Sequence, residues 1–165
     1  MKVLICHIAV VVLMAIFVGT AVLGADSGQV AATVTASVIA VTVSDGGVAY
    51  GTVATSEDTT SSGVNDTQTI TNTGTVNEDF EIKGVDTTHW TLAGAAGDAT
   101  YAHKTCIADC DTTPSWTAMT TSYTDLDTGK TPSATTALDL QITVPTANAG
   151  TAQETANVDI LATAS

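Results

Sequence analysis

The segment Leu138-Asp-Leu-Gln-Ile-Thr-Val144 alternates apolar and polar side chains along its whole length. Alternation with a period of two residues is typical of a strand that buries one face and exposes the other. After a break at residues 145–150, residues 156–162 resume the same alternation, with Ala156, Val158, Ile160 and Ala162 on one face. We predict that the two segments form antiparallel neighbouring strands near the core.

The rest of the chain after residue 24 contains similar short runs that are rich in Thr and Val, two residue types that favour strands. Clusters of Gly, Asn, Asp and Ser separate these runs, and no window has the 3.6-residue spacing of an amphipathic helix. We therefore predict an all-β fold, a single immunoglobulin-like or jelly-roll β-sandwich, with an exposed polar loop at residues 56–63. The strands that we expect cover residues 30–44, 48–55, 67–71, 79–83, 89–93, 99–105, 115–123, 138–144 and 156–162.

Two of these expected strands flank an Asn72-Thr-Gly74 turn, and the second of them has Phe80 and Ile82 on one face. This pattern indicates a β-hairpin. The stretch from Thr69 to Gly84 resembles the strand, Asn-x-Gly turn, strand unit of immunoglobulin-like domains in prokaryotic surface and envelope proteins. It is similar to the TasA and camelysin class of biofilm fibre subunits, and residues 138–145 look like the closing strands of that group.

The resemblance implies a jelly-roll or immunoglobulin-like sandwich. For the fibre class it also implies assembly by donation of a strand from one subunit to the next. The group has no catalytic residues to carry over to this sequence, so the resemblance concerns fold and assembly only.

The beginning of the chain has the composition of a secretory signal, because Lys2 is followed by residues 3–24 without further charge. We expect cleavage before Ala25; the alternative is an uncleaved anchor, because the apolar run is long enough to span a bilayer and would be the only membrane contact. We divide the chain into a signal peptide (1–24), an N-terminal strand (25–38) and a β-sandwich domain (39–165). The mature protein is expected to be secreted, extracellular or displayed on the cell surface.

The chain is strongly acidic, with a formal net charge of −13 and no Arg. Loss of Lys2 with the signal peptide changes this charge to −14. A surface of this sign repels phosphate groups, so nucleic acid and anionic membrane surfaces are not expected partners. The same charge keeps a secreted protein soluble.

Two cysteines, Cys106 and Cys110, remain after the signal peptide. In an oxidising compartment we expect them to form a disulfide that closes a short loop. The alternative is a zinc site made by His103, both cysteines and one Asp, because their spacing allows convergence on a metal.

The sequence gives no catalytic centre, so we do not expect an enzyme or a cofactor. His89 and His103 are the histidines left in the mature chain, they read as ordinary strand residues, and no Gly-x-Ser-x-Gly motif is present. Asn65 begins an N-glycosylation acceptor tripeptide. The weak candidates for a calcium site are two acidic pairs without a complete calcium-binding loop, Asp109 with Asp111 and Asp125 with Asp127.

Residues 30–44 change phase in the middle. The apolar residues fall on even positions as far as Val38, at Val30, Ala32, Val34, Ala36 and Val38, and on odd positions from Ile39 onward. One flat strand cannot bury both sets on one face. Either the first set pairs with a neighbouring subunit as a donor strand, or a single edge strand switches sheets within one subunit.

Two functions follow from these patterns. The first is an extracellular or cell-surface structural subunit of a filament or surface assembly, which self-associates into a homopolymer. The second is a secreted binding module that recognises glycan or protein through its loops. A single domain without repeats or a linked partner domain favours the structural subunit.

Overall fold

The computed structural model describes residues 30–64, 66–147, 149–150 and 152–165. The expected signal peptide and the glycosylation acceptor Asn65 lie outside the described residues. Residues 36–165 form one compact unit. Within the described part of the chain, no helix has the length and hydropathy that are needed to cross a membrane.

Strands dominate the described residues, with one short 3-10 helix, η1 (Ser62–Val64). The strands are β1 (Val41–Val43), β2 (Asp58–Thr60), β3 (Gln68–Asn72), β4 (Glu78–Gly84), β5 (Thr91–Leu92), β6 (Thr100–Cys106), β7 (Thr117–Ala118), β8 (Thr124–Lys130), β9 (Thr135–Thr143) and β10 (Val158–Ala164).

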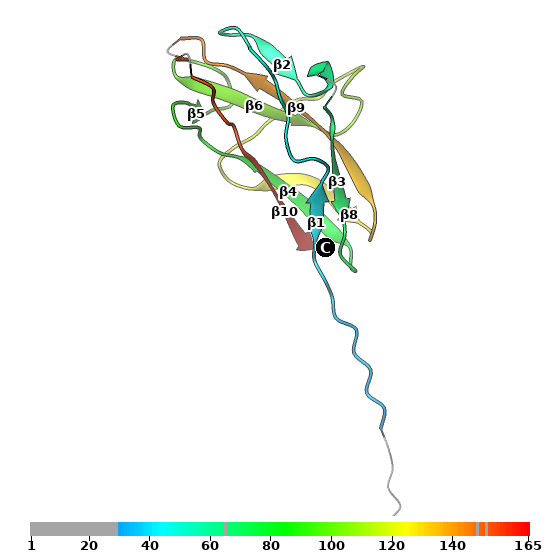
Figure 1. Ribbon diagram of the computed structural model, residues 1–165. Helices are drawn as coiled ribbons and strands as arrows, with labels where there is room; N and C mark the ends of the chain where they lie inside the picture. Colours follow the sequence, from blue (N-terminus) through cyan, green and yellow to red (C-terminus); the bar gives the residue numbers. More distant parts are fainter. Residues whose placement is uncertain (1–29, 65, 148, 151) are drawn as a thin grey trace, which may run out of the picture. The chain divides into compact units, whose positions relative to one another are not determined.

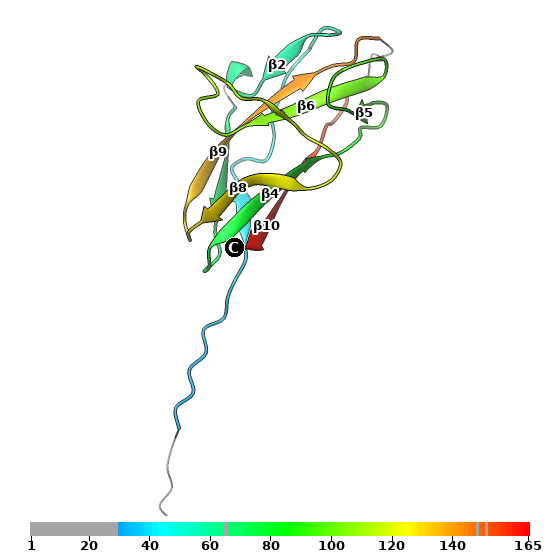
Figure 2. The ribbon, with the colours of Figure 1, turned by 180° about the vertical axis from the view of Figure 1, so that it is seen from behind.

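These strands form two sheets that make a β-sandwich, which confirms the predicted fold class (Figure 1). The larger, seven-stranded sheet has the order β1-β3-β9-β6-β5, with β2 paired to β9 and β7 paired to β6. The smaller, three-stranded sheet has the order β10-β4-β8. In both views β4 is the central strand of the smaller sheet, and β8 and β10 lie on either side of it (Figures 1 and 2).

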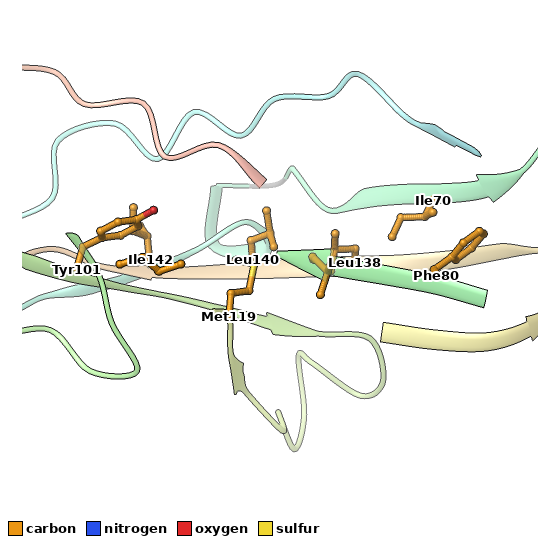
Figure 3. Close-up of a cluster of buried hydrophobic side chains, with 9 residues drawn as sticks. Ile70, Phe80, Tyr101, Met119, Leu138, Leu140 and Ile142 are labelled. Carbon is orange, nitrogen blue, oxygen red and sulfur yellow. The ribbon is translucent and has the colours of Figure 1, made fainter. Parts of the chain in front are cut away.

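The core lies between the sheets and follows the alternation in the sequence. On β4, Phe80 and Ile82 are buried whereas Glu81 and Lys83 are half-buried on the other face, as predicted. The side chains drawn in Figure 3 come from both sheets and fill the space between them. The buried apolar cluster consists of Ile70, Phe80, Ile82, Leu92, Tyr101, Met119, Leu138, Leu140 and Ile142.

The predicted pairing of the last two strands is wrong. β9 pairs with β2, β3 and β6 in the larger sheet, whereas β10 pairs antiparallel with β4 in the smaller sheet. An alternating pattern shows that one face of a strand is buried, but it does not show to which of the two sheets the strand belongs. Both strands point apolar side chains into the same core from opposite sheets.

The predicted hairpin across residues 72–74 is also wrong, because β3 and β4 belong to different sheets. Asn72 is fully buried, and its side-chain amide donates to the carbonyl oxygens of Val76 and Lys130 at 2.9 and 2.8 Å. The amide N–H of Gly74 donates to Asn72 Oδ1 at 2.8 Å. The buried amide thus organises a connection that crosses between the sheets.

Other strand predictions also need correction. Of the expected strand at residues 115–123, only β7 (Thr117–Ala118) is a strand. Residues 48–55 contain no strand, and β2 lies inside the expected polar loop at residues 56–63. β8 was not predicted, because it is an edge strand with little burial and no clear alternation of apolar residues. Of the expected strand at residues 30–44, only Val41–Val43 is a strand.

Candidate assembly site

The apolar side chains of the N-terminal segment are exposed. The exposed fractions of Val30 and Val34 are 91% and 96%, and Val38 is about half exposed. Residues 30–40 lie in no strand, and no described strand pairs with them. Ala32 and Ala36, the other members of the expected assembly strand, are exposed as well. The described chain therefore has no edge strand that switches sheets, because β1 is short and pairs with β3 alone.

The chain becomes attached to the sandwich at residues 38–40, which bind the turn at residues 73–75. The backbone N–H of Val38 donates to Thr75 Oγ1 at 3.0 Å, and the N–H of Thr75 donates to the Val38 carbonyl at 2.9 Å. The N–H of Thr73 donates to the Ala40 carbonyl at 2.8 Å. We call this contact the anchor. It coincides with the change of phase after Val38, so the two halves of residues 30–44 have different structural roles.

Glu78 supports the anchor from inside the sandwich. Its side chain is fully buried, Oε1 accepts a hydrogen bond from the Ala40 N–H at 2.8 Å, and Oε2 has no hydrogen-bond partner among the described groups. Gly74 passes so close that a Cβ atom there would collide with Glu78 Oε1 and the Val38 carbonyl. The buried carboxylate and the glycine together fix the position at which the N-terminal segment leaves the sandwich.

Sequence reasoning missed the part that Glu78 plays in the anchor, although a signal for its burial was present. Glu78 has the same parity as Phe80 and Ile82 in the alternating strand, which places its side chain on the buried face. A carboxylate at such a position needs a hydrogen-bond donor. Its donor, the Ala40 N–H, is distant in sequence and was not predictable from the local pattern.

His103 is a buried core residue. Its Nε2 lies 3.1 Å from the hydroxyl oxygen of Tyr50, and its Nδ1 has no hydrogen-bond partner among the described groups. Burial lowers the pKa of His103 to about 4, so the ring is neutral at pH 7. Burial, and then the charges of Asp66 and Asp139, raise the pKa of Tyr50.

His89 is exposed and joins two connections at the surface. Its Nδ1 lies 2.5 Å from Oε1 of Glu154, in the segment that leads into β10. Hydrogen bonds from Thr87 and His89 lower the pKa of the Glu154 carboxyl. The contact holds the loop that precedes β5 against the loop that precedes β10.

The structure contains the expected disulfide between Cys106, at the end of β6, and Cys110. Their Cα atoms are 5.8 Å apart. Because each sulfur is bonded to the other, neither is a free thiolate for the alternative zinc site. The bond closes a loop that begins at the edge of the core, where Cys106 is buried.

The calcium candidates lie in two places. Asp109 and Asp111 are exposed in the disulfide loop, and Asp125 is exposed on β8. Asp127 Oδ2 is bound by Lys130 Nζ at 2.5 Å and by Thr136 Oγ1 at 2.6 Å. Partial burial raises the pKa of Asp127, but the hydrogen bonds from these two residues outweigh it and the net shift is downward. Across the described ranges, no three His, Cys, Asp or Glu residues are grouped to hold a metal ion.

No family model, no curated protein and no solved structure matches this chain. The candidate site therefore rests on the geometry of the N-terminal segment and its anchor.

Proposed function

We propose that this protein is an extracellular or cell-surface structural subunit that forms a homopolymer by donating residues 30–38 to a neighbouring copy. The observation that carries the proposal is the contrast at Val38. Before it, apolar side chains alternate and are exposed; after it, the chain is held by the anchor and enters β1. A segment with this pattern has the form of a strand that lacks a sheet.

Addition of a strand supplies both affinity and specificity. The donated backbone forms a row of hydrogen bonds with a free sheet edge, and alternate side chains enter pockets. Complete burial of one valine contributes roughly 1.5 to 3 kcal/mol, so burial of Val30 and Val34 against a neighbouring copy favours the contact. Because donor and acceptor are different surfaces, repeated contacts are head-to-tail and build an open filament. The disulfide is consistent with export to an oxidising compartment.

Truncation tests the proposal. We compare protein that starts at Ala25 with protein that starts at Ser37, by electron microscopy and size-exclusion chromatography. The truncated protein keeps Val38 and Ala40, so the anchor and the sandwich are expected to remain, with an unchanged circular dichroism spectrum. The longer protein is expected to form filaments and the shorter one to stay monomeric.

Two charged variants provide a matched pair. Val30→Asp with Val34→Asp places carboxylates on the apolar face of the segment, and Thr33→Asp with Thr35→Asp places them on the opposite face. The first pair is expected to abolish filaments and the second to retain them. A stable monomer of the longer protein under all salt and calcium concentrations would refute strand donation and favour the binding module.

A further inference from the structure

A groove lined by both apolar and polar side chains opens at the edge of the sandwich beside β8. Its volume is about 240 Å³. Ile82 and Met119, each 2% exposed, lie at its base, and Ile107 and Leu126 are half-buried. Figure 2 shows β8 as an outer strand of the smaller sheet, beside β4. We call this feature the β8 groove. Its apolar lining residues are Ile82, Cys106, Ile107, Ala108, Ala118, Met119 and Leu126, and Asp125, Ser115 and three threonines complete the lining.

The groove lies next to strand edges that can accept a further strand. Within the described chain, β8 pairs with β4 only, so its outer edge has no strand beside it. On the other side of the groove, β7 is a two-residue strand that pairs with β6. An unpaired edge presents backbone N–H and C=O groups to any incoming chain. The other edge strand of the smaller sheet, β10, has β1 close beside it and is less open (Figure 1).

The N-terminal segment has the chemistry to enter this groove. Residues 27–44 contain no Asp, Glu or Lys, although the whole chain carries a net charge of −13. A neutral segment approaches the acidic surface of a second copy without the repulsion that most other segments of the chain would meet. Fully extended, residues 30–38 span about 30 Å, which is sufficient to run along the whole of β8.

Resting on the proposed function, we infer that the β8 groove is the acceptor, and that it binds residues 30–38 of a second copy of this chain. The apolar face of the donor, with Val30 and Val34, packs toward Ile82 and Met119, while Val38 stays at the anchor of its own copy. The donor backbone pairs with the free edge of β8. The disulfide loop forms part of one wall, through Cys106 and Ile107.

Cysteine cross-linking tests this assignment. Copies that carry Val30→Cys, Val34→Cys or Val38→Cys are each mixed with copies that carry Ala118→Cys on β7, oxidised mildly, and mapped by non-reducing mass spectrometry. At least one of these pairs is expected to cross-link several-fold more than the Thr33→Cys or Thr35→Cys controls, whose thiols lie on the opposite face. A second acceptor variant, Ala162→Cys, reports on the β10 edge. A chain that carries both Val34→Cys and Ala118→Cys shows whether the segment binds the groove of its own chain.

The outcomes distinguish a failure of the β8 groove as the acceptor from a failure of the proposed structural function. Filaments with cross-links at Ala118 support the β8 groove. Filaments that cross-link at Ala162 instead, or at neither position, overturn the groove but leave the structural function intact. Cross-links that form only within one chain, in the variant that carries both cysteines, also overturn the groove assignment. The groove would then bind the N-terminal segment of the same chain and not that of a second copy. The absence of both filaments and cross-links overturns the proposed function as well.

Discussion

The buried imidazole of His103 makes the stability of the sandwich depend on pH. Its pKa is about 4 in the folded protein and about 6.5 in the unfolded chain, so between these values the unfolded state binds more protons. The contribution of the neutral His103 ring to the free energy of unfolding is therefore fully present above pH 6.5, and it is lost as the pH falls toward 4. The expected loss is about 3 kcal/mol from this residue alone.

Urea unfolding at pH 7 and pH 4.5 measures this effect. Carboxylates also titrate in this range, so the comparison is with His103→Gln, which stays neutral. The variant is expected to show a clearly smaller decrease in the free energy of unfolding. An identical decrease in both proteins would show that His103 does not cause it.

Gly74 tests how tightly the anchor is packed. In Gly74→Ala the added methyl group must displace either the Glu78 carboxylate or the Val38 carbonyl, which breaks the hydrogen bonds of the anchor. We expect a loss of stability of about 1 to 3 kcal/mol, as for other overpacked sites. Gly94→Ala is the matched control, because no atom lies within 4 Å of a Cβ built there. Equal melting temperatures for the two variants would contradict the role of Gly74.

At the scale of elements, the disulfide loop is a local constraint on the chain. Closing a loop this short stabilises the fold by about 2 kcal/mol on the loop-entropy model. The double variant Cys106→Ser with Cys110→Ser is expected to lose about this amount in urea unfolding and to keep its β-rich circular dichroism spectrum. Mass spectrometry of the parent protein under non-reducing conditions should find no free thiol at either position.

Strand prediction succeeded where one face of an element is buried continuously. β4 and β9 show this, because their apolar residues follow every second position into the core. β8 was missed because one of its faces carries Asp125, Asp127 and Gly129, and the other has Leu126 as its single apolar residue. The hairpin was wrongly predicted because the turn residues fit one, whereas the buried Asn72 amide directs the chain to the other sheet.

On the scale of the whole molecule, charge governs how copies approach one another. Copies of a chain with a formal net charge of −13 repel each other, and salt screens this repulsion. The screening length falls from about 30 Å at 0.01 M to about 10 Å at 0.1 M ionic strength. We expect filaments to form faster and at lower protein concentration at the higher ionic strength, as followed by light scattering. Assembly that slows with added salt would indicate an attractive electrostatic contact instead.

The sequence by itself determined the fold class, the strands with continuous alternation, the Cys106–Cys110 loop and the break after Val38. These are local properties, because the period of a strand and the spacing of two cysteines are set along the chain. Only the tertiary structure decided that β9 and β10 face each other from opposite sheets and that Glu78 holds Ala40. It alone also decided that a groove opens beside β8. These features join residues that are far apart in sequence. The local sequence pattern around each residue does not depend on which distant residue it contacts, so the pattern alone does not identify the contact.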